Sequence, residues 1–122
     1  MYYKRVELKV TNQGIHERKI FQGVKIFSRS KLSKDQKSIL TQKLYLTPKQ
    51  NIVYYQRTDV NYDQNWHHNK DYYELAYGQL DGETVFKVCQ DFDELNPFLE
   101  NELLEKLKEK QSAGKFFEKL DI

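Results

Sequence analysis

The chain has few of the residues that build several common kinds of site. Among its 122 residues there is one cysteine, Cys89, so no internal disulfide can form, and its apolar neighbours predict a small buried side chain. Five glycines and two prolines form neither a phosphate loop nor a dinucleotide-binding pattern. No run approaches the roughly 18 apolar residues of a membrane span, and the first residues do not resemble a signal peptide. We therefore expect a cytoplasmic protein without membrane contact.

The length and composition predict one folded domain over residues 1–122. Hydrophobic residues make up 39% and charged residues 31% of the chain, a balance that can support one core. Aromatic residues are frequent at 14%, mostly tyrosine and phenylalanine, and this favours β-structure, where rings pack well on pleated surfaces.

The charge is divided between two halves of opposite sign. Residues 1–58 contain 13 Lys/Arg and 3 Asp/Glu, whereas residues 59–122 contain 7 and 15. A basic half can bind nucleic acid or phosphate, but the two halves can also neutralise each other within one small domain. We favour neutralisation.

Alternating apolar residues predict a hairpin meander of strands over about residues 2–90. A turn at 48–51 and the Asp81-Gly82 pair separate neighbouring strands. The predicted strands lie near 6–10, 18–29, 39–46, 52–60 and 85–89, with a sixth near 73–80.

Helical spacing replaces this alternation from Asp91 onward. Asp91 and Glu94 form an acidic capping box for a first short helix, which Pro97 should break or kink. A second helix is predicted over 101–111, and the helices together occupy about 91–113. The sequence therefore predicts an α+β domain: a twisted antiparallel sheet of five or six strands, two short C-terminal helices and a docked apolar tail at 115–122.

The chain ends on an acidic and apolar motif, Glu118-Lys119-Leu120-Asp121-Ile122. The residues Glu118, Leu120, Asp121 and Ile122 fit the pattern Glu-x-Leu-Asp-Ile, and on this basis the chain resembles the EXLDI family of small prokaryotic proteins. The resemblance implies a fold of this compact, strand-rich kind and no particular reaction.

The segment from Asp59 to Asp71 and Glu74 beyond it hold the densest group of chemically reactive side chains. Adjacent histidines point to opposite sides of an extended chain, and no cysteine or distant histidine completes a ligand set, so we expect no metal and no other cofactor. A small enzyme acting through this loop is an alternative function, although no catalytic residue is assigned. The candidate loop residues are Asp59, Asp63, Trp66, His67, His68, Asp71 and Glu74.

Tyrosines and cations on neighbouring predicted strands form a second candidate site. Such a face could stack single-stranded nucleic acid and contact its phosphates. Tyrosines on adjacent strands are more often cross-strand packing pairs, so we do not favour this function. The candidate face comprises Lys43, Tyr45, Tyr54, Tyr55, Arg57, Tyr73 and Tyr77.

No motif for catalysis, phosphate binding or metal binding is present, so the sequence favours a non-catalytic binding or regulatory module. Its partner would be another protein or, if an apolar face or a strand edge is left uncovered, a second copy of the chain. The small enzyme and the weak nucleic-acid binder remain the alternatives.

Overall fold

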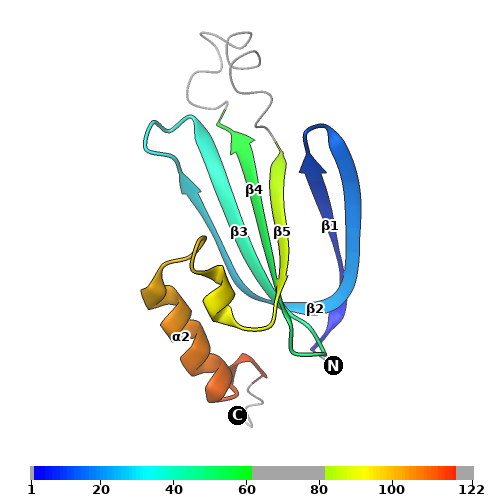
Figure 1. Ribbon diagram of the computed structural model, residues 1–122, viewed down its shortest axis with the longest axis vertical. Coiled ribbons are helices and arrows are strands. Elements are labelled where there is room, and N and C mark those ends of the chain that lie inside the picture. The colour runs from blue at the N-terminus through cyan, green and yellow to red at the C-terminus, as the bar shows by residue number, and fades with distance from the viewer. Residues whose placement is uncertain (1, 62–81, 118–122) are drawn as a thin grey trace, which may run out of the picture.

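The fold is a curled antiparallel sheet with a helical layer on one face (Figure 1). The computed structural model describes residues 2–61 and 82–117. In this part of the chain, five strands follow one another in the order β1-β2-β3-β4-β5, each antiparallel to its neighbour. The strands are β1 (Lys4–Asn12), β2 (Ile15–Leu32), β3 (Ser38–Leu46), β4 (Ile52–Val60) and β5 (Glu83–Cys89). The predicted antiparallel sheet is thus confirmed, while the sixth predicted strand, 73–80, lies outside the described residues.

The long strand β2 makes the sheet curl, because its two halves pair on opposite edges. Residues 15–23 pair with β1 and residues 24–32 pair with β3. The register shifts between Lys25 and Phe27, and such a bulge bends a strand and increases its twist. Gly23 lies at the corner, where an added Cβ would come within 2.9 Å of the Phe21 ring. The result is a half-barrel in which the β1/β2 hairpin folds over the face of β4 and β5.

Hydrogen bonds from the edge of β1 close this half-barrel at one end. The Thr11 N–H donates to Thr84 Oγ1 of β5 over 2.8 Å, and the Gln13 N–H donates to Glu83 Oε1 over 2.9 Å. We call these two contacts the clamp. Nearby, the Tyr55 hydroxyl donates to the Lys9 carbonyl over 2.7 Å. Side chains thus join β1 to β4 and β5, with which β1 shares no strand ladder.

The period-2 alternation of the strands separates two cores. On the inner face of the half-barrel, Leu8 and Val10 of β1 meet side chains of β3 and β4. The opposite face of β3 and β4 packs against the helical layer. The inner core is Leu8, Val10, Tyr45, Val53 and Tyr55; the helix-side core includes Leu44, Leu46, Ile52, Tyr54, Cys89, Phe92, Leu95, Leu99, Leu104 and Leu107.

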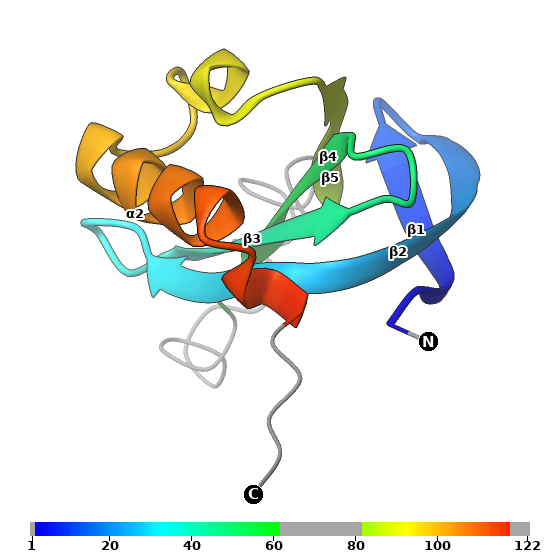
Figure 2. The same cartoon turned by 90° about the horizontal axis from the view of Figure 1, so that it is seen from below.

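The helical layer contains one α-helix, α2 (Asn101–Ser112), between two short 3-10 turns, Phe92–Leu95 and Lys115–Phe117. Figure 2 shows α2 on the opposite side of the molecule from the β1/β2 hairpin. Leu104 and Leu107 recur at helical spacing and are the buried residues of α2. None of the helices in the described residues is long and apolar enough to cross a membrane.

The prediction of two short C-terminal helices is not confirmed for the first of them, where the structure has a 3-10 turn. The predicted capping box is present, since the Asp91 carboxylate accepts from the Glu94 N–H and the Glu94 carboxylate accepts from the Asp91 N–H. It starts only a 3-10 turn, however, which ends at Leu95. Pro97 lacks the N–H that a further turn would need, and its ring crowds the preceding turn.

A buried polar network attaches the helical layer to the sheet. Gln42, only 2% exposed, accepts from Arg29 Nε over 2.7 Å and donates to the Tyr54 hydroxyl and the Phe98 carbonyl. Arg29 also donates from both terminal nitrogens to the Glu100 carboxylate, over 2.8 and 2.7 Å. This bidentate contact lowers the pKa of Glu100 to about 2 and raises the pKa of Arg29.

Candidate binding groove

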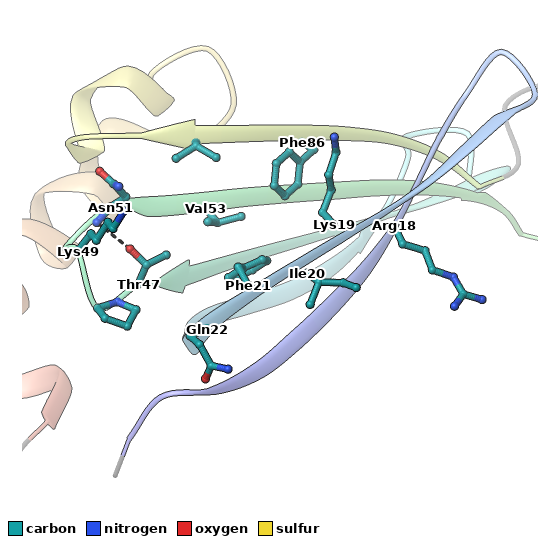
Figure 3. Close-up of a pocket in the computed structure, with 12 residues that line it drawn as sticks. Arg18, Lys19, Ile20, Phe21, Gln22, Thr47, Lys49, Asn51, Val53 and Phe86 are labelled. Carbon is teal, nitrogen blue, oxygen red and sulfur yellow. Dashed lines mark hydrogen bonds between the residues drawn. The ribbon is translucent and has the colours of Figure 1, made fainter.

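A groove of about 510 Å³ opens on the inner face of the half-barrel. Figure 3 shows the residues that line it. One wall is the N-terminal half of β2, the second is the turn between β3 and β4, and the floor comes from β4 and β5. The volume lies within the roughly 300–1,000 Å³ of small-molecule sites. The groove is lined by Arg18, Lys19, Ile20, Phe21, Gln22, Thr47, Pro48, Lys49, Asn51, Val53, Phe86 and Val88.

The floor of the groove is apolar and partly open to solvent. Val53 is almost fully buried, Phe21 and Phe86 are half-buried, and Val88 is 55% exposed. Ile20, on the wall, is 56% exposed. Large apolar side chains that share a concave, exposed surface are typical of a place where a partner docks.

The rim of the groove is positively charged. Arg18, Lys19 and Lys49 line it, and within residues 2–61 and 82–117 no Asp or Glu does. Figure 3 shows the Lys19 side chain reaching from β2 toward the Phe86 ring. Its Nζ lies 5.6 Å from the ring centre, within the range of a cation–π contact.

The ion pairs of these cations are exposed and lie outside the lining. Arg18 pairs with Glu7 over 3.3 Å and Lys19 pairs with Glu17 over 2.9 Å. Within the described residues, no carboxylate lies within ion-pair distance of Lys49. Because exposed pairs contribute little, about 0–1 kcal/mol, an anionic ligand can compete for these cations.

The structure divides the predicted tyrosine and cation face between the two sides of the sheet. Lys43, Tyr45, Tyr55 and Arg57 share the inner face, whereas Tyr54 points to the helical layer and stacks on Phe98 at 4.9 Å between ring centres. Tyr45, Tyr54 and Tyr55 are all buried, and burial raises the pKa of each hydroxyl. These three rings therefore offer no open stacking platform. Tyr73 and Tyr77 lie outside the described residues.

Of the candidate loop, the structure describes only Asp59. Its carboxylate accepts from Arg57 Nε over 2.8 Å, and this hydrogen bond raises the pKa of Arg57. The described residues bring together no group of three potential metal ligands. Outside the described residues lie Asp63, Trp66, His67, His68, Asp71 and Glu74.

The start of the predicted apolar tail packs on the domain. Phe116 and Phe117 are half-buried against the helix-side core, and the Phe117 ring centre lies 4.8 Å from that of Tyr2 and 5.3 Å from that of Tyr3. The C-terminal motif residues Glu118, Leu120, Asp121 and Ile122 lie outside the described residues.

Sequence reasoning did not identify the groove. One signal was available in β2, where Ile20 and Phe21 are adjacent and therefore place apolar side chains on both faces of the strand. A strand with one solvated face needs apolar residues on only one side. Apolar residues on both faces of this strand therefore indicated that its second face is also covered by another part of the protein or by a partner.

Comparisons of the chain with protein-family models, with curated proteins and with solved structures found no match. The resemblance to the EXLDI family stays a prediction from the C-terminal motif. The geometry of the groove is therefore the basis for a functional proposal.

Proposed function

We propose that this protein is a non-catalytic binding module, and that the groove binds a ligand combining an apolar body with a negative charge. One observation carries the proposal: the groove has an apolar floor and three cations at its rim, and among the described residues that line it there is no carboxylate. The floor favours an apolar group, because burying it gains about 25 cal/mol per Å². The rim selects the sign of the charge, since a cationic ligand would be repelled.

A fluorescent carboxylate tests this proposal directly. The probe is 11-(dansylamino)undecanoic acid, whose emission rises when its dansyl group leaves water. We expect saturable binding that dodecanoate displaces and dodecyltrimethylammonium, of the same chain length and opposite charge, does not. Equal displacement by both competitors would contradict a cationic rim.

Two matched substitutions locate the site. Val88→Asp places a carboxylate on the groove floor, where it would repel an anion and reduce apolar contact. Ile15→Asp introduces the same charge at a comparably exposed apolar residue, 65% against 55%, which is not part of the lining. We expect Val88→Asp to weaken probe binding about tenfold or more and Ile15→Asp to leave it nearly unchanged. Equal effects would place the binding elsewhere.

The docked tail belongs to the same proposal. A second pocket, of about 450 Å³, is lined in part by Tyr2, Lys4, Arg5 and Lys25, and Tyr2 contacts the Phe117 ring. Residues 118–122 follow Phe117 directly and combine carboxylates with leucine and isoleucine. Charge complementarity therefore supports this pocket as the docking place of the tail.

The cytoplasmic location and a homodimer stay predictions from the sequence.

A further inference from the structure

One edge of β2 is left without a partner strand beside the groove. Residues 15–23 pair with β1 on one edge, and β3 pairs only with residues 24–32 on the other. β3 ends at Leu46, and the chain then turns back through residues 47–51. The residues of β2 that line the groove, 18–22, thus border it with a backbone edge that no described strand covers.

The clamp shows which backbone groups face this edge. Thr11 directs its N–H and its carbonyl to the Thr84 hydroxyl, away from β2. Its ladder partner is His16, and in an antiparallel pair two opposed residues either bond to each other or both point away. His16 therefore points away from β1, and by alternation so do Arg18, Ile20 and Gln22.

The backbone groups of these last three residues have no partner in the described parts of the chain. Neither their N–H groups nor their carbonyls bond to the backbone of another described segment. Over 18–22 they form a row about 15 Å long, at roughly 3.3 Å per residue. Such an edge is a template on which an extended chain can pair.

We propose that the partner of the groove is an extended peptide segment of another protein, in which apolar and acidic residues alternate and which pairs with β2 as an added strand. The inference rests on the proposed function and narrows its ligand to a peptide. A strand beside β2 would place alternate side chains on the two faces of the ladder. Those pointing inward would meet Phe21, Val53 and Phe86, which calls for apolar residues.

The outward side chains of the peptide would lie beside those of Arg18, Ile20 and Gln22, on the same face of the ladder. Arg18 then favours peptide residues with carboxylate side chains at these outward positions. Its existing ion pair with Glu7 does not prevent this, because that pair is exposed and the Arg18 side chain is 69% accessible. Lys49, at the end of the groove, is a second cation that would attract a negatively charged peptide side chain. An alkyl carboxylate would satisfy the floor and the rim but would leave the backbone edge unused, and for this reason we favour the peptide.

The test uses the full chain and a fluorescein-labelled nine-residue peptide of alternating glutamate and valine, followed by fluorescence anisotropy. Protein concentrations up to about 1 mM detect even weak association. We expect saturable binding that weakens about tenfold or more when lysine replaces glutamate, because the rim is cationic, or when serine replaces valine, because the floor is apolar.

Two N-methylated peptides separate edge pairing from simple docking in the groove. One carries N-methyl groups on its glutamates and the other on its valines, so that each blocks one edge of the peptide strand. We expect one of them to lose binding about tenfold or more and the other to keep it, because alternate amides face opposite edges. If both bind as well as the parent peptide, edge pairing is overturned.

A substitution in β2 makes the same test from the protein side. Ile20→Pro removes the N–H that faces the groove without removing a bond to β1, and Ile20→Ala is its control for the lost side chain. We expect Ile20→Pro to bind about tenfold less than Ile20→Ala, with thermal melting used to verify the fold. Equal binding by the two folded variants contradicts edge pairing. Should Ile20→Pro not fold, the N-methylated peptides decide.

The two proposals fail in distinguishable ways. Binding of the dansyl carboxylate together with no binding of the glutamate and valine peptide overturns the peptide inference and leaves the anion-binding groove in place. Absence of binding by both probes overturns both proposals.

Discussion

The buried side chain of Gln42 allows a quantitative prediction. Gln42→Met keeps the volume and removes three hydrogen bonds, those with Arg29, Tyr54 and Phe98. The substitution leaves the Phe98 carbonyl and Arg29 Nε without this partner. A hydrogen bond to a charged group contributes about 1.5–3 kcal/mol to stability and a neutral one about 1 kcal/mol. The stability lost with these bonds is partly offset by burial of the apolar methionine side chain. We therefore expect a loss of about 2–4 kcal/mol in the free energy of unfolding.

Urea denaturation followed by circular dichroism measures this loss, and thermal melting should show a decrease of about 8–16 °C for a chain of this size. The control is Gln56→Met, which removes only the acceptor of the Tyr54 hydroxyl at a half-buried position and should cost about 1 kcal/mol or less. If Gln42→Met is no more destabilising than Gln56→Met, the network does not anchor the helical layer as we have argued.

Three further predictions concern other parts of the chain. The pKa of Glu100 is about 2 in the folded protein and ordinarily 4.5, so its pair with Arg29 stabilises the fold above pH 4.5 and loses its contribution as the pH falls toward 2. Urea midpoints should therefore depend less on pH in this window for Glu100→Gln than for the parent. Burial leaves Cys89 1% exposed and raises its pKa, so we expect a thiol reagent to modify it rapidly only in denaturant; rapid reaction of the native protein would contradict this burial. Deleting residues 120–122 should cost about 2–4 kcal/mol through lost apolar burial, and a melting temperature within about one degree of the parent would rule out the docked tail.

The central strands were predictable because a short polar turn at 48–51 separates two segments rich in β-branched and aromatic residues. The predicted bounds 39–46 and 52–60 differ from β3 and β4 by at most one residue. β2 was predicted too short at both ends, since its end segments 15–17 and 30–32 are mostly polar and exposed yet pair with β1 and β3. Backbone pairing does not require apolar side chains, so alternation alone underestimates the length of such a strand.

The sequence itself indicated that the residues of the candidate face lie on both sides of the sheet. Tyr54 and Tyr55 are consecutive, so a strand must direct them to opposite faces. The register that pairs Tyr45 with Val53 then places Tyr45 and Tyr55 together on the inner face. The groove, in contrast, was not predictable from periodicity, because it depends on how far the bend of β2 carries residues 18–22 toward Val53 and Phe86.

The clamp has a consequence for how the protein folds. The four strand ladders join consecutive strands, so each can form without waiting for the others. The Thr11 to Thr84 contact joins residues 73 positions apart, and long-range closure pays more chain entropy than a local turn. We therefore expect the half-barrel to close late, so that Thr84→Val mainly accelerates unfolding and changes the folding rate little. Because the groove combines a wall from β2 with a floor from β4 and β5, it exists only after this closure. A bound partner would then act on the lifetime of the native state and not on the speed at which it is reached.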